Sequence, residues 1–378
     1  MKMWNCENMK MWKYENIAKA LAVFIFAYFH AFTFSHSAAA AAEVPTPSDI
    51  RGAYPILTTP YLADGSVDYD SLVKEAEWTD VAGVQGIIWP QSDDSIDLLT
   101  TDEKKCGMSA LAEAAKGFRA RLCLGVEGRS TDEMLELARY GEELSAKFET
   151  RVPQLSTFNS KLSTRIVFIS RPADDCRTQE DLERYYEALA AVAKRPVIIQ
   201  TYNGDKCPAP SVELLVKLAT RHPGIYGWIK EEVRDGFEAN RRMKAELAAK
   251  PPLKTVFSAW GGWQWLYQSR RLGSEGVISE RAALAPMLAE IWRLMEAKDA
   301  TGALDAAYAK YLLAINLMQT VPGDLRGYQL VFFKEKGIFR TTASRTCVDK
   351  DKDPYSWKLD VLEVDDGIKA EIMRRCKK

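Results

Sequence analysis

The feature that most constrains this fold is an alternation of short apolar runs with longer segments whose apolar residues recur at helical spacing. The runs expected to form strands are 52–58, 84–89, 121–126, 166–170, 196–202, 225–230, 255–258 and 276–279. Strands that are apolar on both faces are typical of parallel sheets covered by helices. Because eight strand–helix units close a barrel, the sequence predicts an α/β protein with a (β/α)8 TIM barrel over residues 50–281.

An open, doubly wound sheet fits the same alternation. Nucleotide-binding versions of that sheet carry a glycine signature after a strand, either G-x-G-x-x-G or G-x-x-x-x-G-K-[ST], and neither follows any expected strand here. Residues 282–340 show helical spacing with a break at Pro322-Gly323, and they predict a C-terminal extension of three helices. Residues 341–378 form a charged tail for which the sequence indicates no function.

Residues 1–42 have the pattern of a secretory signal peptide. Positive charges come first, an apolar run follows from Ala20 to Phe34, and small residues close the segment at Ala38–Ala42. An uncleaved membrane anchor and a misassigned start codon are the alternatives, the second because residues 1–8 are nearly repeated at 9–16. We expect an exported protein, periplasmic or secreted.

Charge and composition exclude several classes of function. Residues 1–42 hold four Lys and two Glu, so the other 336 residues carry 47 Lys and Arg against 50 Asp and Glu. A nearly neutral chain has no electrostatic basis for binding nucleic acid. Outside residues 1–42 the only histidine is His222, and no Cys-x-x-Cys pair occurs. A multi-histidine zinc site, a zinc ribbon and a Ser-His-Asp triad are therefore not expected.

Lys230 and Tyr202 are the candidate catalytic residues. Catalytic groups of such barrels lie at the carboxyl ends of the strands, and Lys230 ends an apolar strand there. Desolvation disfavours its ammonium form, and a neutral amine can attack a carbonyl to form a Schiff base. Tyr202 ends the neighbouring strand, where a phenol could shuttle protons. The alternatives are a lysine ion-paired with Glu231 or Glu232, and a tyrosine that covers the barrel core.

Four segments, 52–61, 202–203, 227–231 and 276–279, resemble the dihydrodipicolinate synthase/N-acetylneuraminate lyase family in order and spacing over residues 50–340. The resemblance implies a class I aldolase-type barrel in which Lys230 forms a Schiff base with pyruvate or another 2-keto acid and Tyr202 relays protons. It also implies that Gly276 and Ile278 lie near the substrate carboxylate. The covalent imine replaces any cofactor or metal, and a homo-oligomer, dimer or tetramer, is expected.

The sequence departs from the family pattern after the second strand. The usual Gly-Thr-Thr-Gly-Glu is replaced by Pro90-Gln-Ser-Asp-Asp94. Gln91 and Ser92 are expected to bind the substrate carboxylate, and Arg171 is expected to pair with the two aspartates. The second relay tyrosine and the arginine of the synthases are also missing. These losses argue against a role in lysine biosynthesis and are compatible with another keto-acid lyase, such as one that acts on a sugar acid.

Two further alternatives remain open from the sequence. One is a non-catalytic or weakly catalytic protein that binds a keto acid or sugar acid on the same barrel. The other is a sugar-phosphate aldolase, although the segment Ser258–Trp263 is bulky for a phosphate cradle. Residues 145–165 exceed the family's usual connection and are either a surface insertion or a gene-model fault.

Overall fold

The computed structural model describes residues 50–91, 98–151, 165–202, 207–279, 282–349 and 353–376. Within them, eight parallel strands form one sheet in the order β1-β8-β7-β6-β5-β4-β3-β2. A parallel bridge between Ile56 and Ile88 joins the two ends of this order. The sheet therefore closes on itself, and the predicted (β/α)8 TIM barrel is confirmed.

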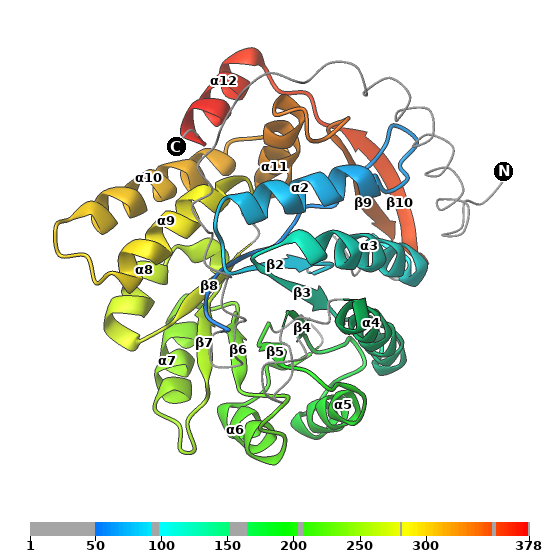
Figure 1. Cartoon of the computed structure of the whole chain (residues 1–378), viewed down its shortest axis with the longest axis vertical. Coiled ribbons are helices and arrows are strands. Elements are labelled where there is room, and N and C mark those ends of the chain that lie inside the picture. The colour runs from blue at the N-terminus through cyan, green and yellow to red at the C-terminus, as the bar shows by residue number, and fades with distance from the viewer. Residues whose placement is uncertain are drawn as a thin grey trace. The chain divides into compact units, whose positions relative to one another are not determined.

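A helix follows each strand along the chain, and Figure 1 shows α2 to α7 on the outside of the strands. The strands are β1 (Gly52–Pro55), β2 (Gly86–Trp89), β3 (Arg121–Gly125), β4 (Ile166–Ser170), β5 (Val197–Gln200), β6 (Trp228–Glu231), β7 (Thr255–Ser258) and β8 (Gly276–Ser279). The helices are α2 (Tyr69–Val81), α3 (Thr101–Ala114), α4 (Thr131–Arg151), α5 (Gln179–Val192), α6 (Val212–Arg221), α7 (Gly236–Leu247), α8 (Trp265–Tyr267), α9 (Ala285–Glu296), α10 (Ala303–Met318) and α11 (Asp324–Glu335). The last three are the predicted C-terminal helices.

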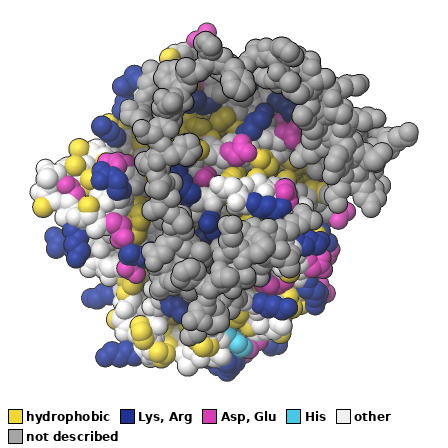
Figure 2. Space-filling view, viewed as in Figure 1, with side chains coloured by type: hydrophobic (Ala, Val, Ile, Leu, Met, Phe, Trp, Pro, Cys, Tyr) yellow, Lys and Arg dark blue, Asp and Glu magenta, His cyan; other side chains and the backbone are white. Residues whose placement is uncertain are grey.

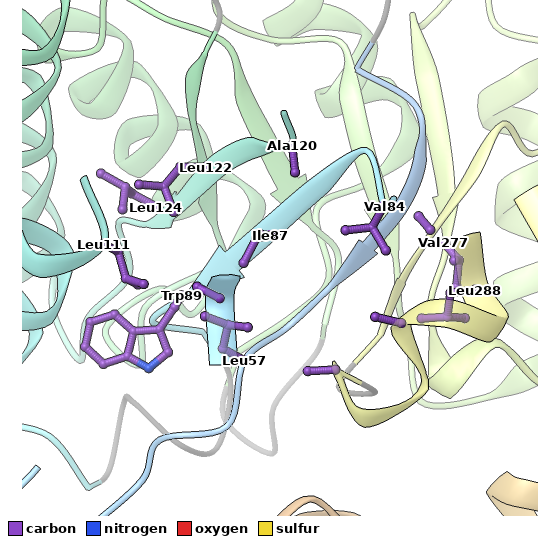
Figure 3. Packing of buried hydrophobic residues seen from close by; sticks show 14 of the residues in the cluster. Leu57, Val84, Ile87, Trp89, Leu111, Ala120, Leu122, Leu124, Val277 and Leu288 are labelled. Carbon is purple, nitrogen blue, oxygen red and sulfur yellow. The ribbon is translucent and has the colours of Figure 1, made fainter. Parts of the chain in front are cut away.

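Inward and outward side chains alternate along the barrel strands. The inward side chains form one apolar cluster: Ile50, Tyr54, Ile56, Ile88, Cys123, Val167, Ile169, Ile198, Trp228, Phe257 and Ile278. The outward side chains pack on the helices, and Figure 3 shows Trp89 and Leu124 near Leu111 of α3. Because strand side chains alternate with a period of two, this cluster identifies which residues at the strand ends face the barrel mouth.

Several segments differ from the predicted boundaries. Strand β5 ends at Gln200, so Tyr202 lies in the loop that follows rather than in the strand. Helix α4 runs to Arg151, which extends it into the predicted insertion, and residues 152–164 of that insertion lie outside the described residues.

The predicted signal peptide, 1–42, also lies outside the described residues. Among the helices in the described ranges, none combines the length and the apolar content needed to span a membrane.

Residues 343–375, for which the sequence predicted only a charged tail, contain regular structure. Strands β9 (Ala343–Asp349) and β10 (Asp353–Val361) form an antiparallel hairpin, and helix α12 (Asp366–Arg375) follows it. Figure 1 shows this hairpin near α2 and α3, although the segments are far apart in the sequence. The amphipathic signal is weak here because the hairpin residues alternate between buried and exposed over only part of β9.

Arg345 of β9 attaches this hairpin to the barrel. Its side chain is buried and donates hydrogen bonds to the carbonyls of Gly65 and Leu98 at 2.8 Å each. It also forms a two-pronged ion pair with Glu103 at 2.7 and 3.0 Å. The guanidinium lies over the ring of Trp357 in β10, 4.3 Å from its centroid. A planar guanidinium suits this site because its five N–H donors form a rigid fork.

A second buried ionic group connects β6 to α7. Arg242 of α7 contacts Glu231 at 3.2 Å and Glu246 at 3.5 Å, and both carboxylate side chains are fully buried. Burial, together with the neighbouring Glu231 carboxylate, raises the pKa of Glu246 well above its ordinary value. One arginine thus holds two carboxyl groups, and the protonated form of Glu246 relieves the repulsion between them.

Replacing Arg345 with methionine is expected to lower the free energy of unfolding by about 3 kcal/mol, because the partly buried ion pair with Glu103 and two hydrogen bonds to buried carbonyls are lost. Urea unfolding followed by tryptophan fluorescence measures this change. The matched control is Arg374→Met on α12, since that side chain is 60% exposed in its pair with Glu371 and should cost no more than about 0.5 kcal/mol. Equal losses in the two variants would contradict the role of Arg345.

The raised pKa of Glu246 predicts how stability depends on pH. A carboxyl group with a higher pKa in the folded chain binds more protons when folded, so stability falls as the pH rises through that pKa. The free energy of unfolding should therefore decline as the pH rises above 4.5, the ordinary value for Glu. Glu246→Gln should remove this part of the decline, and Glu290→Gln on the exposed side of α9 should retain it. If the free energy of unfolding of Glu246→Gln declined with rising pH as steeply as that of the wild-type chain, the Glu246 carboxyl would already be ionised.

Candidate active site

Lys230 lies in the barrel interior at the carboxyl end of β6. It follows Trp228, an inward residue, at a spacing of two, and its own side chain is only 1% exposed. Its neighbours in register are Gln200 of β5 and Phe257 of β7. The stem of the lysine therefore lies among apolar side chains, and its amine is held where the strand ends meet.

Glu232 is the ion-pair partner of Lys230. The Lys230 Nζ lies 2.8 Å from the Glu232 Oε2, and the side chain of Glu232 is largely buried. Glu231, the other partner considered from the sequence, points outward to Arg242. This difference follows from the strand period, which places residues 230 and 232 on the same side and residue 231 on the opposite side. The carboxylate is therefore in position to accept a proton from the lysine.

A chain of hydrogen bonds extends from this ion pair to the second strand. The Gln200 amide donates to the Glu232 Oε2 at 2.5 Å, and the Gln91 amide donates to the Gln200 Oε1. Both glutamines are buried. Gln91, predicted to bind a carboxylate, is therefore connected to Lys230 through two side chains. Gln200 was not predicted from the sequence, whereas Glu232 was expected only as one of two possible ion-pair partners of Lys230.

Tyr202 lies in a cationic environment. Its hydroxyl accepts a hydrogen bond from the Arg234 guanidinium at 2.9 Å. The guanidinium carbons of Arg171 and Arg234 lie 5.5 and 5.4 Å from the centre of its ring. Within the described ranges, no hydrogen bond joins Tyr202 to Lys230. Arg234 was not found from the sequence, because it lies in the loop after β6 rather than at a strand end.

Arg171 follows β4 and has a polar atom available for a ligand. Its Nε is buried and has no hydrogen-bond partner in the part of the chain that the structure describes. Its backbone carbonyl accepts a hydrogen bond from the Tyr185 hydroxyl at 2.9 Å, which holds the start of the loop. The predicted pairing of Arg171 with Asp93 and Asp94 lies outside the described residues, as does Ser92.

Gly276 and Ile278 lie in β8, where the barrel closes against β1. A side chain at Gly276 would begin 2.5 Å from the carbonyl oxygen of Gly52, so only glycine permits this approach. Ile278 pairs with Tyr54 of β1, and its side chain belongs to the inward cluster. The proximity of these two residues to a substrate carboxylate stays a prediction.

The mouth of the barrel opens into a cavity of about 640 Å³, whose wall includes Thr58 and Gln91. Among the residues that the structure describes, no group of three His, Cys, Asp or Glu side chains is arranged to hold a metal ion. The arrangement at the mouth comprises a buried amine, a carboxylate in contact with it, amide groups and a nearby guanidinium. Such a set can form an imine with a carbonyl compound and bind a negatively charged group beside it.

Comparison with known proteins identifies similar sequences. No family model matches the chain. The chain is 28% identical over 244 residues to a 4-hydroxy-tetrahydrodipicolinate synthase of Rhizobium meliloti, which covers 63% of this chain and 72% of the relative. It is 26% identical over 255 residues to an uncharacterized DapA-like lyase of Pyrococcus furiosus, which covers 66% and 76% of the two chains.

Solved structures share the fold at lower sequence identity. The Ruminococcus gnavus sialic acid aldolase has a TM-score of 0.67 at 15% identity and covers 86% of this chain and 96% of its own. YagE of E. coli K12, a prophage protein of the dihydrodipicolinic acid synthase family in complex with pyruvate, has a TM-score of 0.64 at 17% identity, with coverages of 86% and 97%. The chain is therefore similar in sequence to dihydrodipicolinate synthases and to a DapA-like lyase, and it shares the fold of the solved dihydrodipicolinate synthase-family and sialic acid aldolase structures.

Proposed function

We propose that this protein is an exported lyase that forms a Schiff base between Lys230 and a 2-keto acid such as pyruvate. The observation that carries the proposal is the burial of Lys230 at the carboxyl end of β6, in contact with the Glu232 carboxylate. Pyruvate is the ligand named for the structurally similar YagE. Export rests on the leader pattern of residues 1–42.

The proposed reaction begins with transfer of a proton from the Lys230 ammonium to Glu232. The neutral amine then attacks the C2 carbonyl carbon and gives a carbinolamine, whose hydroxyl takes a proton and leaves as water. The resulting iminium accepts an electron pair when the C4 hydroxyl gives its proton to a base at the mouth, the C3–C4 bond breaks and an aldehyde leaves, or when a C3 proton is lost. Return of a proton to C3 and addition of water release the 2-keto acid and regenerate the amine.

Other residues at the mouth would hold the carboxylate of the keto acid. The unpartnered Nε of Arg171 is a suitable donor, the amide of Gln91 has a second N–H besides the one that it donates to Gln200, and Tyr202 would move protons at the edge of the site. Gln91 replaces a hydroxyl residue of the synthases, and the second relay tyrosine is missing. These differences support a substrate other than that of lysine biosynthesis, and we propose a sugar acid.

A binding protein without turnover is the second candidate. The observation that favours it is the hydrogen bond from Arg234 to the Tyr202 hydroxyl, because Tyr202 makes no such bond to Lys230 in the described ranges. If Tyr202 cannot relay protons to Lys230, the site would bind a keto acid and turn it over slowly or not at all.

Borohydride trapping tests the Schiff base. Incubation with pyruvate and sodium borohydride, read by intact mass, should add one reduced pyruvyl group to the wild-type chain and none to Lys230→Ala. The matched control is Lys254→Ala, since Lys254 is a half-buried lysine whose pKa is lowered by burial, and it should still be trapped. An adduct on Lys230→Ala would overturn the assignment of this lysine.

Exchange of the pyruvate methyl protons in deuterium oxide, followed by proton NMR, separates the enzyme from the binding protein. An enamine exchanges these protons, so an enzyme should accelerate the exchange. Tyr202→Phe should slow it by about 10²–10⁴-fold, the usual contribution of a positioned acid–base group, while trapping persists. Tyr267→Phe, at a tyrosine that is 52% exposed, is the control. A ligand-induced rise in melting temperature without exchange would instead support the binding protein.

A further inference from the structure

The cavity at the barrel mouth has a second wall that is not part of the barrel. On one side lie Ile56, Thr58 and Gln91, which follow β1 and β2. On the other side lie the first residues of α11 and three side chains of the β9–β10 hairpin, Ser344, Thr346 and Asp360. Figure 2 shows Lys and Arg side chains beside Asp and Glu side chains on the described part of the face drawn in Figure 1.

We propose that this second wall, formed by the start of α11 and the β9–β10 hairpin, binds the hydroxylated part of the substrate that lies beyond the keto acid. The inference rests on the proposed function for the identity of the keto-acid end. It makes Asp360, Thr346 and Arg326 residues that determine specificity.

The strand pairing places the hairpin side chains together. Asp360 of β10 lies directly opposite Ser344 of β9, and Thr346 is two residues further along. Residues with these relations share one face of an antiparallel pair. Arg345, which alternates with them, points instead to Gly65 and to its other partners on the barrel. The attachment of the hairpin by Arg345 therefore turns the three polar side chains toward the cavity.

The chemistry of this wall suits hydroxyl groups. Asp360 accepts a hydrogen bond from the Thr346 hydroxyl at 2.7 Å, and this bond holds the pKa of Asp360 below its ordinary value. Arg326 of α11 donates to the Ser344 hydroxyl and to the Arg345 carbonyl at 3.3 and 3.1 Å. Carboxylates accept, a guanidinium donates and hydroxyls do both. The hydroxyl groups of a sugar-acid chain can both donate and accept hydrogen bonds, so such a chain can bond with the carboxylate, the guanidinium and the hydroxyls of this wall.

The same wall disfavours two other kinds of substrate. Asp324 and Asp360 are balanced by Arg326 and by Lys358, which pairs with Asp360 at 3.4 Å, so the wall has no excess of positive charge to bind a distal phosphate or carboxylate. A purely apolar tail would remove water from these charged groups without replacing their hydrogen bonds. The neutral, hydroxylated chain is therefore the class that the wall fits.

Two features of the cavity point to a ligand. Gln91 is 1% exposed, lies in the cavity wall, and its Oε1 has no hydrogen-bond partner in the described part of the chain. At the opposite wall, Gly323 and Asp324 adopt left-handed backbone angles, with φ of 77° and 48°. Such a conformation is costly for a residue other than glycine and is concentrated at functional sites. A bound hydroxyl could donate to Gln91 while its neighbours contact α11 and β10.

The test measures non-covalent binding in the Lys230→Ala background, so its outcome does not depend on Schiff-base formation. Isothermal calorimetry compares 2-keto-3-deoxygluconate with 2-ketohexanoate, which has the same carbon chain without the hydroxyls. We expect tighter binding of the hydroxylated acid, and a preference reduced about tenfold by Asp360→Asn, since hydrogen bonds to charged groups contribute on this scale.

Two further variants make the outcome decisive. Thr346→Val, which keeps the side-chain shape, should also reduce the preference, whereas Asp366→Asn on α12, at a side chain that is 99% exposed, should leave it unchanged. Equal binding of the two acids, or a preference unaffected by both hairpin substitutions, would overturn the proposed wall. Failure of borohydride trapping in the wild-type chain would overturn the proposed function and not this subsite.

Discussion

The ion pair between Lys230 and Glu232 is the interaction on which the arrangement at the barrel mouth depends. An ammonium group at the end of an apolar strand loses its hydration, and it stays in the interior only if a carboxylate and further hydrogen bonds replace the water. Glu232 supplies the carboxylate at 2.8 Å, and Gln200 and Gln91 continue the polar contacts toward β2. These contacts set the position of the residues from three strands.

The C-terminal hairpin adds a second constraint, which is the shape of the space above the barrel. Arg345 joins it to loops after β1 and β2 and to Glu103 of α3. These bonds replace the water that the buried guanidinium would otherwise require. The hairpin then closes one side of the cavity with polar groups that the barrel itself does not contain. Chemistry and selectivity are thus assigned to separate parts of the chain: the barrel holds the amine, and the C-terminal residues border the space beside it.

The sequence predicted most of the fold and part of the site. Eight apolar runs were enough for the barrel, because buried parallel strands have a local signal in their composition. Lys230 could be found because it ends such a run. Gln200 could not be found, since its role comes from the pairing of β5 with β6 and not from any local pattern, and Glu232 could be named only as one of two possible partners of Lys230. The hairpin was missed for a related reason: its buried face is formed by contacts with residues about 240 to 280 positions earlier, as in the bonds from Arg345 to Glu103 and Gly65.

What the sequence by itself determined is the barrel, its family resemblance and the strand that carries the lysine, because periodicity and short motifs are properties of neighbouring residues. Only the tertiary structure decided which of two adjacent glutamates meets Lys230, that Tyr202 contacts two arginines, and that the charged C-terminal residues border the barrel mouth. The physical reason is that ion pairs, stacking and cavities depend on distances between side chains remote in sequence. Those distances are set by strand register and by helix packing, and they exist only once the barrel has closed.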